Sequence, residues 1–482
     1  MTEHGWSALL SGRNALRSAA LAGGVALHAI NVYMVVTILP SLVHDIGGEK
    51  YYAWAATVFI VASLVSASFS IRLLQWAGPR LAYTYAALLF GCGTLIAASA
   101  MTMPFFLLGR TVQGLGGGLL LSLSYSMVRI IFPAPLWPRA LAVISGMWGI
   151  ATLLGPAVGG LFAEYAIWRA AFWLVAALSL FFAIFSLKIL PKKNTNNTQK
   201  TSLPLPQITS LCLSVLFISI GSAFETLSGQ IISLLGGVAL LGLLVWQEST
   251  SKNRMLPKRA LFPKSPLFPL YILVFLLPIA TNGSELFLPL FLQKLHNCGP
   301  LTAGYLASLL SIGWTLGTLI SAGAQLSTIR FILKSVPLIS AGAMATLFIM
   351  IPIPSSTNSV LIIISLALVV TGFAIGSIWP HLLARILQCA GSHDAERASA
   401  SLTTTMLFTV ALSAAISGLI ANFSGLVTPG GVEGTSKAAS ALFAFYTLLF
   451  ATLCTFYAVL VARSMEREQR RQQRKMLDPK QD

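Results

Sequence analysis

The chain has 482 residues, of which 56% are hydrophobic and only 9% are charged, and its mean hydropathy is +0.80. These values exclude a soluble globular protein and predict an integral membrane protein. The net charge of +17 would suggest a nucleic-acid partner in a soluble chain, but in a membrane protein basic residues collect on one side of the bilayer.

Apolar stretches of about 18 or more residues recur along the whole chain, and each is long enough to cross the bilayer as a helix. A membrane barrel would instead show alternating segments of about ten residues. Two of the spans are short, so twelve crossings with a re-entrant middle remain the alternative. We predict fourteen spans at 16–40, 51–71, 81–101, 105–128, 140–163, 169–190, 208–225, 229–247, 267–292, 302–325, 335–353, 358–384, 398–422 and 439–462.

The distribution of Lys and Arg indicates the orientation of these spans. With the N-terminus inside, 26 of the 31 basic residues lie in cytoplasmic segments or at adjoining span ends. Only Lys50, Arg169, Lys294 and Lys437 lie outside, and Arg110 falls within a span. We therefore expect an even number of crossings, both termini in the cytoplasm, and a multi-pass protein of the cytoplasmic (inner) membrane.

Two polar, proline-containing breaks divide the chain, at 191–207 and 248–266. They enclose the two short spans and predict four regions. Paired six-helix bundles around a midplane site are typical of transporters. The regions are an N-terminal bundle (1–190), cytoplasmic linkers with two additional membrane helices (191–266), a C-terminal bundle (267–462) and a basic cytoplasmic tail (463–482).

The sequence gives little support for an enzyme. The chain has no Gly-Lys pair, so it has no Walker loop, and no metalloprotease or serine-hydrolase motif stands in a credible context. Its five cysteines show no CxxC or close pair, so no disulfide or metal framework is expected. We predict a protein that is not an enzyme and uses neither a cofactor nor a metal.

The fifth span contains helix-breaking residues in the stretch "LLGPAVGG" (153–160). Pro156 cannot donate a backbone hydrogen bond, and Gly155, Gly159 and Gly160 allow close helix approach. The pattern predicts a bent, tightly packed helix that acts as a hinge. The alternative is a packing face of small residues without a mechanistic role.

Three motifs in the correct order and spans resemble the major facilitator superfamily, and within it the fourteen-helix drug:proton antiporters. They are "LLGPAVGG", which resembles the antiporter motif, "LLGRTVQGLGGG" at the start of the fourth span, and "WRAAFW" at the start of the sixth. The resemblance is specific over residues 16–190. It implies two six-helix bundles with an inserted two-helix hairpin, alternating access, and exchange of an organic compound for protons.

Two positions depart from the family pattern. In the gating loop after the second span, "IRLLQWAGPR" matches at Gly78 and Arg80, but Gln75 replaces the expected Asp. In the first span, Asn31 stands where the family carries an Asp. The loop therefore departs from the pattern that is thought to latch the bundles in this family, and a proton-binding carboxylate is missing from one expected place.

Glu285 in the ninth span is the clearest carboxylate inside the membrane, and it shares a helix face with Asn282. In the resembled fold, the first and fourth helices of each bundle line the central cavity. Those helices here carry His28 and Asn31, Arg110 and Gln113, and Trp379 near the inner end of the twelfth span. Counted from the outer span ends, Asn31, Arg110 and Glu285 all lie about 8–14 Å deep.

We interpret Glu285, Arg110 and His28 as the proton- or ion-coupling residues, and Asn31, Gln113, Asn282 and Trp379 as the substrate cavity. The alternatives are a permanent Glu285–Arg110 ion pair or a Glu285 in a wet outer vestibule. His28 would then be a hydrogen-bonded structural residue, and the aromatic residues would face lipid.

The predicted function is proton-coupled export of drug-like or amphiphilic compounds by a monomer in the lipid bilayer, with no nucleic-acid partner. One rival is an uptake symporter or facilitator for a metabolite. A rival of another class is a membrane scaffold or sensor that does not transport.

Overall fold

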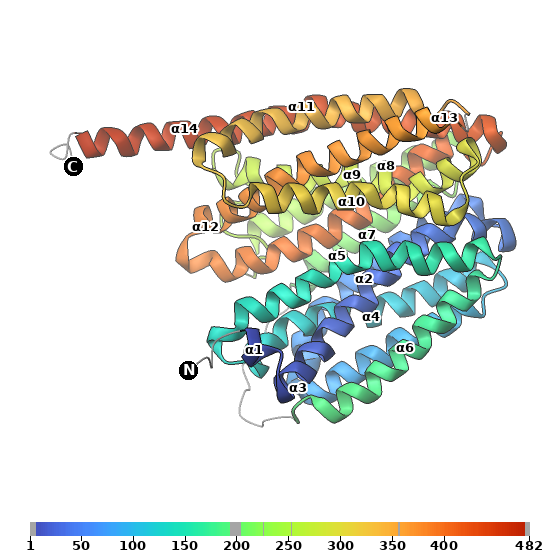
Figure 1. Cartoon of the computed structure of the whole chain (residues 1–482). Helices are drawn as coiled ribbons and strands as arrows, with labels where there is room; N and C mark the ends of the chain where they lie inside the picture. The colour runs from blue at the N-terminus through green and yellow to red at the C-terminus, as the bar shows by residue number, and fades with distance from the viewer. Residues whose placement is uncertain (1–5, 193–203, 225, 252, 355–356, 478–482) are drawn as a thin grey trace.

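The computed structural model describes residues 6–192, 204–224, 226–251, 253–354 and 357–477. Regular secondary structure in these ranges is helical throughout, as the apolar runs predict (Figure 1). Residues 193–203 of the predicted linker and 478–482 of the predicted tail lie outside the described residues. The helices are α1 (Trp6–Leu9), α2 (Gly12–Ile46), α3 (Trp54–Ala98), α4 (Met103–Ile131), α5 (Trp137–Glu164), α6 (Trp168–Ile189), α7 (Leu205–Gly221), α8 (Leu227–Thr250), α9 (Leu267–His296), α10 (Pro300–Ser321), α11 (Leu326–Met350), α12 (Asn358–Phe423), α13 (Gly431–Leu449) and α14 (Thr455–Leu477).

Helix α3 contains two of the predicted crossings. Its 45 residues would extend about 68 Å as one straight helix, roughly twice the hydrocarbon thickness. Gly78 interrupts it with a positive φ of 74°, which glycine adopts without strain. Phe59 and Gly93, from the two parts of α3, both contact α4 near Gln113, so the parts lie side by side. The loop predicted between these spans is therefore almost entirely helical.

Helix α12 is also too long for one crossing, because its 66 residues would extend about 99 Å. Its apolar segments are Asn358–Ala390 and Arg397–Phe423. Within the described residues, twelve segments are long and apolar enough to span a membrane, one of them the 50-residue Glu49–Ala98, and α7 is a shorter apolar helix. Fourteen crossings are compatible with this structure.

Several predicted boundaries were wrong. Helix α11 begins at Leu326 rather than 335, and α13 begins at Gly431 rather than 439. The final helix continues beyond 462 to Leu477, so the basic tail begins as a helix. Hydropathy marks the apolar centre of a crossing, whereas helices continue into polar ends where water satisfies their backbone groups.

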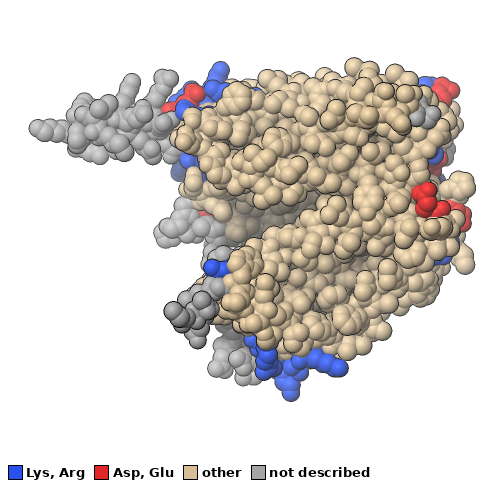
Figure 2. Space-filling model, viewed as in Figure 1, with Lys and Arg blue, Asp and Glu red and all other residues tan. Residues whose placement is uncertain are grey.

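The two halves of the chain lie against each other, with α2 to α6 below and α9 to α14 above in Figure 1. Both termini lie at the same end of the molecule, and α14 extends beyond it. Figure 2 shows Lys and Arg side chains gathered around this end. At the opposite end basic side chains pair with acidic ones, as in Arg169–Asp45 (2.6 Å) and Lys437–Glu433 (2.7 Å).

The extra hairpin of α7 and α8 packs on both halves, through contacts of α7 with α3 and α12. Trp54 of α3 donates its indole N–H to the Ser219 carbonyl (3.1 Å) and the Ser222 hydroxyl (3.2 Å). Asn422 of α12 donates to the Ser222 carbonyl (2.7 Å) and the Lys50 carbonyl (2.9 Å). These bonds join α7 to both halves at the end opposite the termini.

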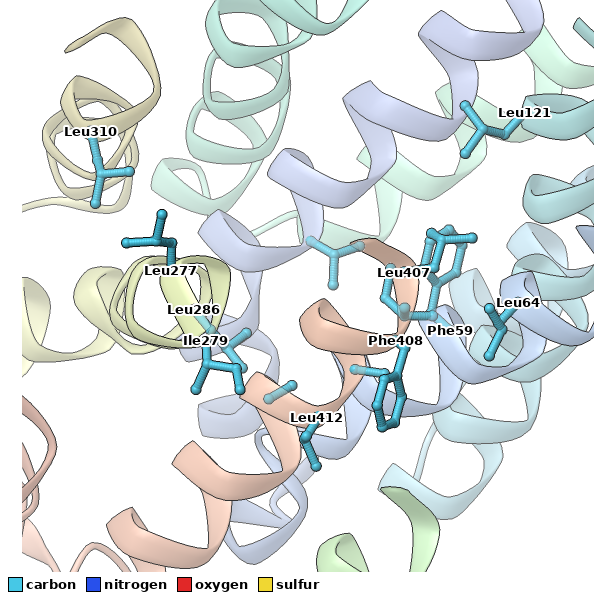
Figure 3. Packing of buried hydrophobic residues seen from close by; sticks show 14 of the residues in the cluster. Phe59, Leu64, Leu121, Leu277, Ile279, Leu286, Leu310, Leu407, Phe408 and Leu412 are labelled. Atoms are coloured by element: carbon cyan, nitrogen blue, oxygen red, sulfur yellow. The ribbon is translucent and has the colours of Figure 1, made fainter. Parts of the chain in front are cut away.

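Apolar side chains fill the contact between the halves. Figure 3 shows Leu407 and Phe408 of α12 beside Phe59 of α3, and Leu412 in the direction of Ile279 of α9. All five side chains are at least nine-tenths buried. This packing surrounds the polar residues that form the candidate site.

Candidate transport site

A small cavity of about 70 Å³ lies between the two halves, bordered by α2, α3 and α4 on one side and by α9 and α12 on the other. Most of its lining is aliphatic. The polar side chains that border it are Tyr33, Arg110, Asn282 and Glu285. The sequence analysis predicted the last three of these from their depth and spacing.

Glu285 is half-buried on α9, and its Oε1 accepts a hydrogen bond from the Ser311 hydroxyl at 2.9 Å. Ser311, on α10, also lies 3.3 Å from the hydroxyl of Tyr33 on α2. This chain of polar groups connects the carboxylate to the opposite half of the protein. Sequence reasoning missed Tyr33 and Ser311, because single hydroxyl residues are common in membrane helices and give no distinguishing signal.

Arg110 is only 2% exposed, on α4. Its Nε donates to the Ala55 carbonyl (3.0 Å), its Nη1 donates to the Gln113 side-chain oxygen, and its guanidinium lies 4.1 Å from the centre of the Phe59 ring. Arg110 and Glu285 border one cavity, yet no ion pair joins these two described residues. A permanent pair, one of the alternatives above, is therefore not present in this conformation.

The predicted polar residues of the N-terminal half form a network behind Arg110. Gln113 donates to Asn31 Oδ1 (3.0 Å) and to the Thr94 hydroxyl (2.7 Å). Asn31 and Gln113 are fully buried and do not border the cavity. Their contact positions Gln113, which in turn orients Arg110.

His28 and Trp379 lie away from this cavity. The His28 ring packs between Phe59, at a centroid distance of 5.2 Å, and Trp148, at 5.9 Å. Trp379 packs against Trp314 at 5.3 Å within the C-terminal half. In this conformation neither side chain borders the cavity that contains Glu285.

The glycines of the fifth-span stretch allow α5 to pack between α2 and α10. A Cβ at Gly155 would lie 2.4 Å from the Tyr33 Cβ, and one at Gly159 would lie 2.6 Å from the Met34 carbonyl oxygen. A Cβ at Gly160 would lie 2.6 Å from the Cα of Leu301, in the other half. Pro156 lies in the same contact, close to Gly304 of α10. The stretch thus forms part of the contact between the halves.

Further contacts hold the halves together at the end opposite the termini. Lys294 pairs with Glu49, and the backbone N–H of Leu301 donates to the Glu164 carboxylate at 3.3 Å. Toward the other end of α5, Gly146 and Gly149 face open space. Figure 2 shows a recess between the halves on the side of the termini. The structure is therefore closed at one end and open at the other.

Arg80 of the predicted gating loop makes a contact within the N-terminal half. Arg80, two residues after the break at Gly78, donates from Nε to the Leu190 carbonyl at the end of α6 (2.9 Å). Gln75 lies on the preceding turn of α3 and is partly exposed. This contact satisfies a carbonyl at a helix end, where the backbone leaves acceptors unpaired.

Comparison with known proteins identifies the family. The model of the Major Facilitator Superfamily matches residues 21–417, from within α2 to within α12, which include every residue that borders the cavity. This chain belongs to that superfamily. It is accordingly a multi-pass membrane transporter, and not an enzyme, as predicted.

Among its relatives is a probable multidrug-efflux transporter of Mycobacterium tuberculosis, which is 33% identical over 460 residues covering 92% of this chain and 94% of the relative. Multidrug resistance protein 3 of Bacillus subtilis is 22% identical and covers 62% of this chain and 59% of its own.

Two solved structures share the fold. One is a bacterial homologue of the human lysosomal transporter Spinster in an inward-facing, unoccupied conformation, with a TM-score of 0.66, 13% identity, and coverage of 94% of this chain and 98% of its own. The other is a peptide transporter in complex with sulfate, with a TM-score of 0.67, 14% identity, and coverage of 93% and 95%.

Proposed function

We propose that this transporter exports drug-like or amphiphilic organic compounds across the cytoplasmic membrane in exchange for protons. The transporting unit is a monomer, with bundles at 1–190 and 267–462 and both termini in the cytoplasm. The excess of basic residues on the termini side supports this orientation. The multidrug-efflux name of the mycobacterial relative supports the class of substrate.

The observation that carries the proposal is the placement of Glu285. Its carboxylate borders the cavity between the halves, accepts a hydrogen bond from Ser311, and has no ion-pair partner among the described residues. A charged carboxylate away from bulk water is costly unless it is paired or neutralised. A proton and a cationic group of the substrate can each neutralise it, and they exclude each other. Such competition produces exchange.

The polar chain from Glu285 through Ser311 to Tyr33 links the charge of Glu285 to the conformational change. A charged carboxylate accepts the Ser311 hydrogen bond more strongly than a protonated one does. Because Tyr33 belongs to the other half, the charge of Glu285 affects a contact between the halves. Loading and unloading of the carboxylate therefore favours different relative positions of α2 and α10.

A flux assay with purified protein in proteoliposomes tests the proposal. The substrate is rhodamine B ethyl ester, a cationic dye, and a second, pH-sensitive dye reports proton movement. Wild-type protein is expected to move protons in the direction opposite to the dye, and Glu285→Gln is expected to lose this proton movement. Glu433→Gln is the control, because Glu433 is exposed and pairs with Lys437. Wild-type export that is unchanged when the pH gradient is collapsed would refute antiport.

A second candidate is an uptake symporter or facilitator. It is favoured by Asn31, a neutral residue where the family carries an Asp, and by its hydrogen bond with Gln113. In that case the dye assay would show no proton counterflow in wild-type protein. Transport of a metabolite down its own gradient would then be equal in wild type and Glu285→Gln.

A further inference from the structure

We infer that the transported compound is an amphiphilic zwitterion, and that Arg110 binds its anionic group. It rests on the proposed function in one respect: a cationic group of the substrate takes the place of the proton on Glu285. The compound would have a cationic group, an apolar body, and a carboxylate or a similar oxyanion. Three observations support this substrate class.

The first observation is that Arg110 has unused N–H donors. Its Nε and Nη1 are occupied by the Ala55 carbonyl and by Gln113. No hydrogen bond joins Nη2 to a described residue. The fully enclosed atoms without a hydrogen-bond partner do not include Nη2, so Nη2 is accessible. Arg110 borders the cavity, so the N–H groups of Nη2 are available to a molecule within it, together with the second N–H of Nη1. Arginine binds oxyanions through such N–H groups with short, charge-assisted bonds.

The second observation is the charge of the site. Arg110 and Glu285 are the charged side chains among the residues that border the cavity, and they come from opposite halves. A buried cation without a counter-ion is costly in a membrane protein. Phe59 and the neutral acceptors around Arg110 reduce this cost but supply no negative charge. An anionic group on the substrate supplies it.

A zwitterion is the class that satisfies both charged residues at once. Its anionic group would pair with Arg110 and its cationic group with Glu285, so the loaded site is neutral. A purely cationic compound would leave Arg110 without a counter-ion. A purely anionic compound would place a second negative charge near Glu285 and would not displace its proton.

The third observation is the remaining lining of the cavity. Val32, Val36 and Leu39 of α2, Ile60 of α3 and Leu286 of α9 present aliphatic surface to the cavity that both charged residues border. Such walls bind an apolar body, while a few polar groups determine its orientation. The lining thus matches a molecule with an apolar body and two opposite charges, and the cavity of about 70 Å³ must widen during the transport cycle to admit it.

Rhodamine B and its ethyl ester form a matched pair of probes. Both contain the same cationic ring system, and the ester differs by having its carboxylate blocked. In proteoliposomes we expect the wild-type KM for rhodamine B to be lower than that for the ester by about tenfold or more, the effect of one charge-assisted hydrogen bond. Arg110→Gln should reduce this ratio to near one, and Arg110→Lys should retain part of it.

The wild-type ratio is decisive even if an Arg110 variant does not fold. Equal KM values for the two dyes in wild type would overturn the inference, and proton-coupled transport of the ester would leave the proposed exporter intact. A ratio that persists in a folded Arg110→Gln protein would also overturn it. If the ratio is present in wild type and lost in Arg110→Gln but no proton moves, the anion site is supported and antiport fails.

Discussion

Gly160→Ala tests whether the fifth-span glycines control closure at the end opposite the termini. The new Cβ would lie 2.6 Å from the Leu301 Cα, so α5 and α10 must separate by about 0.8 Å to reach an ordinary contact of 3.4 Å. Overpacking of this kind costs about 1–3 kcal/mol. Because Gly160 and Leu301 belong to different halves, the cost applies to the closed state, and the closed-to-open ratio should fall at least about fivefold.

Spin labels at Tyr165 and Ile353, which are 70% and 58% exposed at this end, report the separation of the halves. The labels are introduced into protein without its five native cysteines. Double electron–electron resonance in nanodiscs should show a larger long-distance population for Gly160→Ala.

Two glycines of the same helix provide controls for this prediction. Gly159→Ala should reduce thermal stability without changing the label distance, because its Cβ would meet Met34 within the same half. Gly149→Ala should change neither the distance nor the stability by much, because its Cβ would face open space and alanine favours the helix. If Gly160→Ala and Gly149→Ala give the same distance distribution, α5 does not control closure.

Two further substitutions test contacts of the site and of the hairpin. Ser311→Ala removes the hydrogen bond to Glu285 and should slow proton-coupled exchange roughly tenfold, whereas Ser308→Ala, which loses a bond to the Gly304 carbonyl within its own helix, should have little effect. Equal rates for the two serine variants would contradict the role of the polar chain. Trp54→Phe removes both indole bonds to α7, at a cost of about 1 kcal/mol, and should accelerate amide exchange in 205–221. Trp246→Phe is its control, because this side chain is 62% exposed on α8, and unchanged exchange in Trp54→Phe would refute the tether.

Much of the fold is predictable from sequence because hydropathy reports the transfer free energy of each segment. The fourteen apolar runs and the asymmetry of Lys and Arg are sufficient to propose the number of crossings. The helical conformation on both sides of the break at Gly78 is not predictable in this way, since polar residues between crossings are compatible with either a loop or a helix end. That local conformation depends on how α3 packs against α4.

Part of the site is predictable for a different reason. Counting 1.5 Å per residue from the span ends places Arg110 and Glu285 at one depth, and the structure places both at one cavity. Depth alone does not indicate which side chains share a face across two halves. His28 lies on the same helix as Asn31 but packs between two aromatic rings, whereas Tyr33 and Ser311 reach Glu285 through the rotation of α2 and α10.

The hydrogen bonds of α7 have a mechanical consequence. Trp54 and Asn422 attach this helix to α3 and α12 at one end of the protein, so any separation of the halves there must extend or break these bonds. Each of the two donor side chains adds about 1 kcal/mol to the resistance. The additional hairpin thus resists separation of the two halves at this end, and this resistance contributes to the energy barrier of each transport cycle.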